Sequence, residues 1–338
     1  MASGVRHDEV KKPDDGLRLD RWFRKHFPAL THGRLEKLLR QGRVRLEGKR
    51  VKSAARVVQG QKVRIPPEVL QIPDASAFPI SNADDEKFAT LAKELHKAIL
   101  YKDEDILVLN KPSGLAVQGG SKTHIHVDAA LPYLKMGAEE SPRLVHRLDK
   151  DTSGVLILAR TRQVAHTLTR YFAAREVDKV YWALVHGVPR PLEGAITDPL
   201  IKAKDEDGQE KMHLVSLDEE EAKEAHTDFA TMERAAPHLS WVAFRPRTGR
   251  THQIRAHAAA IGHPIIGDGK YRISEKQAGG LLAKKLHLHA RSIMMPRLGG
   301  KRGYFTCVAP LRSHMAESWD ILGFDEASAE NPFPDIFR

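Results

Sequence analysis

A segment without hydrophobic periodicity, from Pro66 to about Asp85, separates two parts of the chain that do show periodicity. Its richness in Pro, Ala, Ser and Asp is typical of an interdomain linker. The chain has 338 residues, which is more than a single domain usually contains. We therefore expect a small basic domain at residues 16–65, a linker at 66–97 and a larger domain at 98–325.

The small N-terminal part carries most of the positive charge. Residues 16–65 contain 15 Lys or Arg residues against Asp20, Glu36 and Glu47, which gives this part a net charge of +12. The whole chain has a net charge of +10, so the remainder sums to −2. A well-solvated surface is the plain alternative, but charge concentrated in so short a segment favours a polyanionic partner.

Two helices and a small sheet are expected in this basic part. Apolar residues recur at helical spacing from Arg18 to Leu39, with a break at Pro28. After the helices, the glycine of a tight turn is expected at Gly48. Three short strands are expected, of which the first two form a hairpin around this turn, at residues 43–46, 50–51 and 62–65.

The order of these elements and the run from Gln41 to Val51 resemble the S-four RNA-binding domain, a module shared by ribosomal proteins and RNA-modifying enzymes. The resemblance implies that this part binds structured RNA through its basic side chains. The expected RNA-binding residues are Arg18, Arg21, Arg34, Lys37, Arg40, Arg43, Arg45, Lys49 and Arg50.

The larger part alternates apolar runs with helical segments, which predicts an α+β fold. We expect a mixed, largely antiparallel sheet with flanking helices, in addition to the small α/β RNA-binding domain. One helix is expected at residues 162–175, and the acidic run 218–224 is expected to be an exposed excursion. The apolar runs expected to form strands are 106–109, 155–159, 180–185, 239–244, 286–293 and 304–308.

The densest polar cluster, His146 to Gly154, stands directly before an apolar strand. Polar side chains beside a buried strand need partners or a cleft. A tight turn would account for residues 151–154, with the glycine in an unusual conformation. It would not account for His146, Arg147 and Asp149, so these three are candidates for a functional site.

A second cluster, Thr248 to His257, combines basic residues with the start of a helix. Thr251 is expected to be the helix N-cap, which would put His252 and Arg255 three residues apart on one helical face. An exposed basic helix face is the alternative. Basic side chains at a helix start can also hold a phosphate or pair with a carboxylate.

A third cluster, Lys179 to Gly187, alternates as a strand does. The alternation puts Lys179, Tyr181 and Ala183 on one face of that strand. An aromatic residue in a strand usually packs in the core, and this is the plain interpretation of Tyr181. Beside a basic site, however, an aromatic ring can stack on a nucleic-acid base.

In this order, the three clusters resemble the motifs of the RluA family of pseudouridine synthases, over residues 99–310. A further run, Leu109 to Ser121, resembles the C-type synthases of large-subunit ribosomal RNA, except that Gln118 stands where many relatives have His. These enzymes convert uridine into its isomer pseudouridine, so the resemblance implies no redox or metal cofactor. Large-subunit ribosomal RNA is the preferred substrate, and transfer RNA is the alternative.

The resemblance also implies a role for individual residues. Asp149 is expected to be the catalytic carboxylate, acting on the base ring or on the anomeric carbon, and Arg255 is expected to keep it ionised. Tyr181 is expected to stack on the uracil and to assist proton removal from carbon 5. Arg147 is expected to fill the space that a flipped nucleotide leaves in the RNA. The expected substrate-binding residues are His146, Arg147, Lys179, Arg250, Thr251 and His252.

Other functions compete with this one. A kinase loop needs Asp directly after His-Arg, and here Leu148 intervenes. A metal-dependent nuclease or deaminase could use the pair His124 and His126 or the pair His287 and His289, although each pair also fits one face of a strand. An inactive RNA-binding or ribosome-assembly factor is the rival from a different class.

Composition bears on where the protein works. The single cysteine, Cys307, fits a reducing compartment, and residues 1–16 lack the apolar core of a signal peptide. No apolar run approaches the length of a membrane span. We therefore expect a cytoplasmic monomer that binds structured RNA, preferably ribosomal RNA, without a membrane, a metal or a cofactor.

Overall fold

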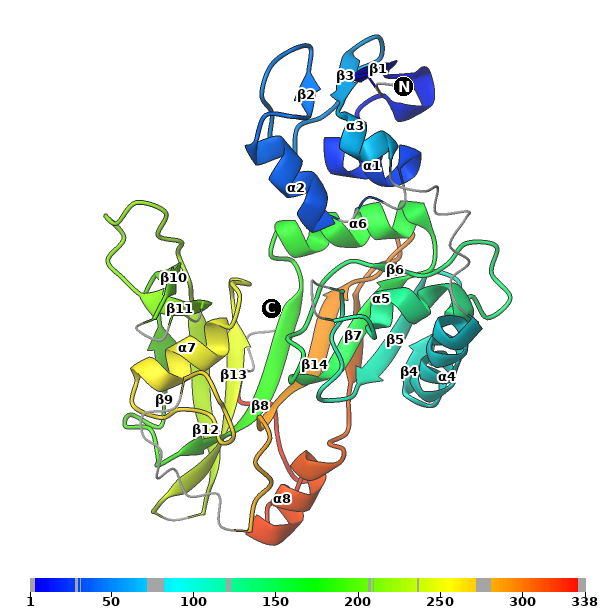
Figure 1. Ribbon diagram of the computed structural model, residues 1–338. Coiled ribbons are helices and arrows are strands. Elements are labelled where there is room, and N and C mark those ends of the chain that lie inside the picture. Colours follow the sequence, from blue (N-terminus) through cyan, green and yellow to red (C-terminus); the bar gives the residue numbers. More distant parts are fainter. Residues whose placement is uncertain are drawn as a thin grey trace. The chain divides into compact units, whose positions relative to one another are not determined.

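The computed structural model describes residues 4–27, 30, 32–71, 82–119, 123–205, 208, 210–235, 237–271 and 281–333. Contacts between residues divide the chain into two compact units, Met1–Lys87 and Phe88–Arg338 (Figure 1). We call them the small unit and the large unit.

The small unit combines short helices with a three-stranded sheet of order β1-β3-β2. Two of these helices, α1 and α2, cover the segment predicted to be helical, with α2 ending one residue beyond it, and they bury its apolar residues, among them Trp22, Phe23 and Leu38. Its elements are β1 (Arg6–Glu9), the 3₁₀ helix η1 (Lys12–Asp14), α1 (Leu19–His26), α2 (His32–Arg40), β2 (Arg45–Leu46), β3 (Lys62–Ile65) and α3 (Pro67–Leu70).

The predicted hairpin around Gly48 is only partly right. Its turn forms, with Glu47 and Gly48 both at positive φ. The second strand at residues 50–51 does not form, because β2 pairs with the longer strand β3 instead. The small unit also begins before residue 16, since β1 pairs with β3 and forms the other edge of the sheet.

The large unit is built on a ten-stranded sheet with the order β4-β5-β7-β14-β8-β13-β12-β9, in which β15 also pairs with β14 and β6 with β7. Only the pairing of β7 with β14 is parallel within this sheet, so the predicted mixed, largely antiparallel fold class is confirmed. A separate hairpin joins β10 and β11. The strands are β4 (Ile99–Lys102), β5 (Ile106–Lys111), β6 (Arg143–Leu144), β7 (Ser153–Ala159), β8 (Asp178–His186), β9 (Glu193–Ile196), β10 (Leu200–Lys204), β11 (Glu210–Leu214), β12 (Thr227–Ala235), β13 (Leu239–Pro246), β14 (Leu288–Pro296) and β15 (Tyr304–Val308).

Helices cover the sheet of the large unit, with α6 next to β7 and α7 next to β12 and β13 (Figure 1). Strands β5 and β7 show why both faces need cover, because every one of their residues is buried. Leu107 packs on the side of α4 and α5, and Ile106 packs on the side of α6. The helices are α4 (Asn82–Lys97), α5 (Val127–Ala130), the 3₁₀ helix η3 (Leu131–Leu134), α6 (Arg162–Ala173), α7 (Gln253–Ala260) and α8 (His314–Leu322).

Helix α4 corrects the predicted boundary of the linker. It falls within the range 66–97, yet Leu91 and Leu95 are buried in a core cluster with Leu107 of β5. The apolar face of this helix was not recognised in the sequence, because Pro-rich and Asp-rich residues directly precede it. The large unit therefore begins before residue 98, while residues 72–81 of the predicted linker lie outside the described part of the chain.

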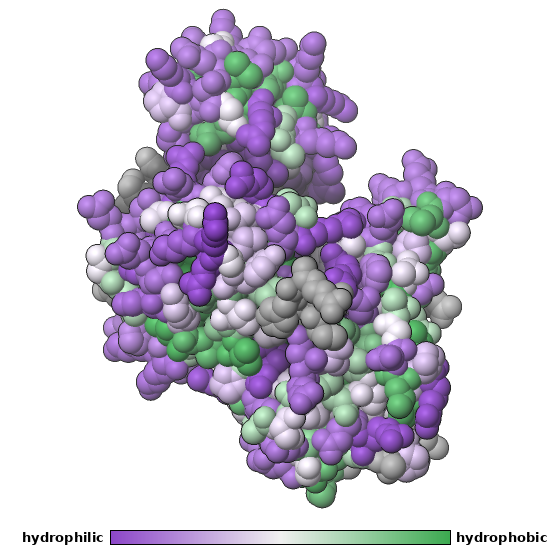
Figure 2. Space-filling view, turned by 180° about the vertical axis from the view of Figure 1, so that it is seen from behind, coloured by the Kyte–Doolittle hydropathy of each residue, from purple (hydrophilic) through white to green (hydrophobic). Residues whose placement is uncertain are grey.

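The face of the molecule behind the view of Figure 1 is predominantly polar. Figure 2 shows that it is mostly hydrophilic and that hydrophobic residues form only small areas on it. Within the ranges described above, no helix is long and apolar enough to cross a membrane. The acidic run 218–224 is almost entirely exposed, as predicted.

Candidate active site

A cavity of about 490 Å³ opens in the large unit where the three polar clusters of the sequence meet. The first cluster forms the loop between β6 and β7, the second forms the loop from β13 into α7, and the third is β8. Strand β8 lies between β14 and β13, so the cavity rests on the centre of the sheet. The polar lining residues are His146, Arg147, Asp149, Thr152, Arg175, Lys179, Tyr181, Arg247, Thr248, Arg250, Thr251, His252, Gln253 and Arg255.

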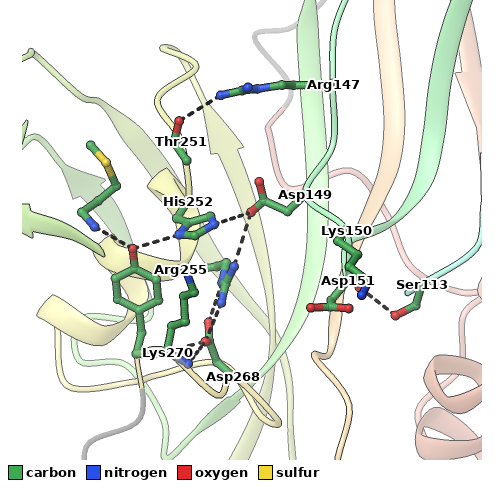
Figure 3. Close-up of polar contacts among 12 residues, drawn as sticks. Ser113, Arg147, Asp149, Lys150, Asp151, Thr251, His252, Arg255, Asp268 and Lys270 are labelled. Carbon is green, nitrogen blue, oxygen red and sulfur yellow. Dashed lines mark hydrogen bonds and ion pairs between the residues drawn. The ribbon is translucent and has the colours of Figure 1, made fainter. Parts of the chain in front are cut away.

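Asp149 points toward two basic side chains from the start of α7 (Figure 3). Its Oδ2 atom lies 3.5 Å from Nη1 of Arg255 and 3.8 Å from Nε2 of His252. The side chain of Asp149 is 29% exposed, whereas that of Arg255 is 8% exposed. The carboxylate is thus open to the cavity while its positively charged neighbour is shielded from water.

Asp268 holds Arg255 from the other side. Its two carboxylate oxygens accept hydrogen bonds from Nε and Nη2 of Arg255, both at 2.7 Å, and Oδ1 also accepts the backbone N–H groups of Lys270 and Tyr271. Burial by itself raises the pKa of Asp268, but these hydrogen bonds outweigh it and keep that pKa below its usual value. Asp268 was not among the predicted site residues, although an Asp between two glycines after the apolar pair Ile265–Ile266 is a recognisable signal.

His252 sits before α7 in a left-handed conformation, with a φ of 51°. The hydroxyl of Tyr271 accepts the backbone N–H of Met212 and lies 3.1 Å from Nδ1 of His252. The hydroxyl proton is then available to Nδ1, so we assign the ring proton of neutral His252 to Nε2, which faces Asp149. Burial lowers the pKa of His252, and the charge of Asp149 opposes that shift.

Thr251 is not the helix N-cap that the sequence predicts. His252 occupies that position, in a left-handed conformation and without a side-chain hydrogen bond to the first helical turn. The hydroxyl of Thr251 instead accepts a hydrogen bond of 3.1 Å from Nη2 of Arg147 (Figure 3). Arg250 is also held by the protein, because its Nε donates to the carbonyl of Glu224 at 2.9 Å.

Gln253, which no pattern in the sequence singled out, fixes the loop before α7. Its side chain is buried, and Oε1 accepts hydrogen bonds from the Thr248 hydroxyl at 2.7 Å and from the Arg250 backbone N–H at 3.0 Å. Its Nε2 donates to the carbonyl of His226 and to the hydroxyl of Thr227, both at 2.9 Å. The amide therefore ties the arginine-rich loop to β12.

Tyr181 and Lys179 lie on the same face of β8 and both line the cavity. Burial and the charge of Asp149 raise the pKa of Tyr181, so its phenol is neutral at neutral pH. Burial also lowers the pKa of Lys179. The ring of Tyr181 therefore presents an uncharged surface beside a carboxylate and an amine.

His146 lines the cavity and also stabilises the loop that carries it. Its Nε2 accepts the backbone N–H of Ile157 at 2.9 Å, and its ring stacks on Phe172 with 4.7 Å between centroids. Burial, assisted by the charge of Lys179, lowers the pKa of His146 to about 3. The neutral ring can offer only its Nδ1 side to a substrate.

Lys111, at the end of β5, is fully buried below the loop that carries Asp149. Its amine donates to the carbonyls of Pro112, Leu115 and Lys150, at 2.9, 2.8 and 3.0 Å. Burial lowers the pKa of Lys111 to about 7, although nearby carboxylates oppose the shift. This lysine connects the loop after β5 to the residue that follows Asp149.

Three of the four histidines proposed as metal ligands have other partners. His126 accepts the backbone N–H of Ala129 in the first turn of α5. His287 contacts Ser318 and the carbonyl of Lys285, and His289 contacts Ser153 and the carbonyl of Ala309. Over the described ranges, no group of three His, Cys, Asp or Glu side chains could hold a metal ion.

The predicted RNA-binding residues of the small unit are exposed except for Arg45, which is half-buried. Arg45 donates to the carbonyls of Gly42 and Gly48 and so stabilises the turn. Arg18 and Arg43 pair with carboxylates of the same unit. The others are on α1, on α2 and after the turn.

Comparison with known proteins agrees with the motifs. The family model of RNA pseudouridylate synthases matches residues 105–260, which include Asp149, Tyr181 and Arg255. The chain is 34% identical over 281 residues to a ribosomal large subunit pseudouridine synthase C of Rickettsia bellii, covering 83% of this chain and 90% of the relative. It is 33% identical over 320 residues to the protein of that name from Vibrio cholerae, covering 94% of this chain and 97% of the relative.

A solved structure is similar as well. The human RNA pseudouridylate synthase domain containing 4 superposes with a TM-score of 0.59 at 30% identity, over 73% of this chain and 98% of the human one. Sequence, motifs and fold agree on one assignment. The chain belongs to the RNA pseudouridine synthases, in the RluA family that its three motifs resemble.

Proposed function

We propose that the protein converts specific uridines of large-subunit ribosomal RNA into pseudouridine, with Asp149 as the carboxylate that acts on the nucleoside. The observation that carries this proposal is the position of Asp149, open to the cavity and 3.5 Å from a buried guanidinium. The names of the relatives from Rickettsia bellii and Vibrio cholerae support the choice of RNA. We expect the protein in the cytoplasm, together with that RNA.

The proposed reaction breaks the bond between the sugar and N1 of uracil, turns the base and joins the sugar to carbon 5. Carbon 5 then loses its proton to water and N1 takes one up, so the product is an isomer of uridine. Asp149 attacks the base ring or the anomeric carbon, while Arg255 and His252 keep the carboxylate oriented. Tyr181 stacks on the uracil. Because the pKa of Tyr181 is raised, stacking suits its phenol better than removal of the carbon 5 proton does.

The target uridine must leave its RNA stack to reach the cavity. Arg147 is the proposed substitute in that stack, because its planar guanidinium lines the cavity and is oriented by Thr251. Lys179, Arg250 and the Nδ1 side of His146 are the proposed contacts to the flipped nucleotide. The small unit, with its net charge of +12 at residues 16–65, is proposed to supply RNA affinity as an S-four domain.

The test is tritium release from large-subunit ribosomal RNA transcripts labelled at carbon 5 of uracil. The wild type should release label, and Asp149→Asn should lose roughly four to six orders of magnitude in rate, the range found when single residues of a covalent catalytic unit are removed. Asp151→Asn, an exposed neighbour two residues away, is the matched control and should stay within a few-fold of wild type. Turnover by Asp149→Asn would reject the assignment of the carboxylate. Release only from transfer RNA would change the substrate, and no release from either RNA would favour the inactive binding factor.

A further inference from the structure

The charged residues of the cavity are unevenly balanced. Six Arg or Lys residues line it, whereas Asp149 is the one carboxylate among the lining residues. Four of the six cations are already occupied, because each has a hydrogen bond or ion pair within the large unit. These four are Arg147, Arg247, Arg250 and Arg255.

Arg175 and Lys179 are different. Neither side chain makes a hydrogen bond or an ion pair with any residue that the structure describes, and both residues line the cavity, Arg175 just after the end of α6 and Lys179 at the start of β8. The carboxylate next in sequence, Asp178, is bound instead to Arg245. Lys179 is partly buried, and a buried amine without a partner is costly.

The backbone of Arg175 is a second, independent observation. Helix α6 ends with the N–H of Glu176 bonded to the carbonyl of Tyr171 and that of Arg175 bonded to the carbonyl of Phe172. In this motif the residue at the position of Arg175 is usually glycine, because its φ is positive, here 61°. A long charged side chain kept at this strained position points to a function for that side chain.

The alternative explanation for Arg175 is that a cation at the C-terminal end of α6 interacts favourably with the helix dipole. It explains a charge near this helix end, but it does not explain Lys179, which lies outside the helix and faces the same cavity. Phosphate groups are the anions that an RNA substrate brings in, and arginine binds them with a fork of donors.

We infer that Arg175 and Lys179 form a phosphate subsite that grips the RNA backbone next to the flipped uridine. The inference rests on the proposed function for the identity of the ligand as RNA. In this arrangement Asp149 and Tyr181 contact the nucleoside from one side, and the wall between α6 and β8 holds the phosphodiester. The subsite fixes the nucleotide's backbone without reading its base.

The test is equilibrium binding of unmodified large-subunit ribosomal RNA transcript to the full-length protein over a range of salt concentrations. Arg175→Gly and Lys179→Met should each weaken binding roughly tenfold, as for one lost charged hydrogen bond. Each should also make the slope of log affinity against log salt shallower by about 0.7 to 0.9, the share of one phosphate. Arg175→Lys should keep the slope.

Arg175→Gly separates binding from folding. Glycine adopts a positive φ without strain. The unfolding midpoint of Arg175→Gly should therefore equal or exceed that of the wild type, while the RNA affinity of this variant falls. Arg234→Ala removes an exposed arginine of β12 that does not line the cavity, and it should change neither quantity. Unchanged salt slopes for Arg175→Gly and Lys179→Met, or an equal loss of RNA affinity in Arg234→Ala, would contradict the proposed phosphate subsite. Because binding is measured without turnover, tritium release by the wild type would then still support the proposed reaction.

Discussion

Asp149, Arg255 and Asp268 form a row of alternating charges in which the two outer carboxylates have different surroundings. Asp149 is open to the cavity, whereas Asp268 is buried and accepts both fork donors of Arg255. Breaking a buried ion pair leaves one charge without compensation, which is far more costly than losing an exposed pair.

Asp268→Asn is therefore expected to lower the free energy of unfolding by about 2 to 4 kcal/mol and the rate of tritium release by about a hundredfold. Urea unfolding and tritium release measure the two effects. Glu210→Gln, which removes an exposed partner of Lys202, is the control and should leave both unchanged. A normal rate in Asp268→Asn would show that Arg255 is held in place without this carboxylate.

Lys111→Met should destabilise the protein by about 2 to 4 kcal/mol, because three carbonyls lose their donor. The effect should depend on pH. The pKa of Lys111 is about 7 in the folded protein, against 10.5 for an ordinary lysine in an unfolded chain, so between these values the unfolded chain binds more protons. The contribution of this group to the free energy of unfolding therefore rises with pH, by at most about 1.4 kcal/mol per unit. Denaturant titrations at pH 7 and 9 should show a larger difference between wild type and variant at pH 9, and an equal difference would contradict the shift.

The sequence made some of these residues predictable and not others. Asp149 and Arg255 stand in dense polar clusters beside apolar segments, and polar density near a buried strand signals a site. Lys111 contacts only backbone carbonyls, and a backbone partner leaves no trace in residue type. The network of Gln253 likewise depends on β12, which is distant in sequence.

At the scale of elements, the parallel contact between β7 and β14 joins two regions of the sheet directly below the site. Gly154 makes that contact possible. Its φ is 107°, and a Cβ atom at this position would lie 2.2 Å from the carbonyl oxygen of Ala290. Backbone atoms of a central strand cannot move away as the end of a side chain can.

Gly154→Ala should consequently lower the free energy of unfolding by more than about 3 kcal/mol, since strain and overlap add. Gly300→Ala is the matched control, with a φ of 72° and no heavy atom within 4 Å of the added Cβ. It should show only the cost of the backbone conformation, about 1 kcal/mol. Thermal or urea unfolding of both variants provides the comparison, and equal losses would mean that the approach to Ala290 is relaxed in solution.

The strands of the core were accessible from sequence because both of their faces are buried, which produces continuous apolar runs such as those of β5 and β7. Strand β12 was missed. It carries Glu233 and Arg234 on exposed positions, and it is a strand because β13 and β9 supply its hydrogen bonds. Pairing over long sequence distance overrode a weak local signal.

For the whole molecule, the main asymmetry is that of charge between the two units. The net charge of +12 at residues 16–65 should dominate long-range attraction to RNA, whereas the proposed chemistry belongs to the large unit. Helix α4 determines where a truncation must be made, because its buried face belongs to the core of the large unit.

A chain that begins at Asn82 should therefore lose affinity while keeping turnover at saturating RNA. If the small unit neutralises about five phosphates, the salt slope should become shallower by roughly 3 to 4 and the apparent Michaelis constant should rise. Salt titrations and tritium release on both chains test this. Equal slopes would mean that the basic segment is only a solvated surface, and a folded but inactive truncation would mean that the small unit helps to build the site.

The direction of the Arg255 fork has a consequence for the reaction barrier. An arginine that grips a reacting carboxylate with both donors stabilises it most in the ground state, since the carboxylate gives up its charge as it attacks. Such stabilisation is lost on the way to the transition state and so slows the reaction. Here Arg255 gives both fork donors to Asp268, whose side chain is fully buried, and offers Asp149 a single nitrogen at 3.5 Å. In the proposed reaction, Asp149 is therefore aligned without a two-donor ion pair that would have to be given up as it attacks.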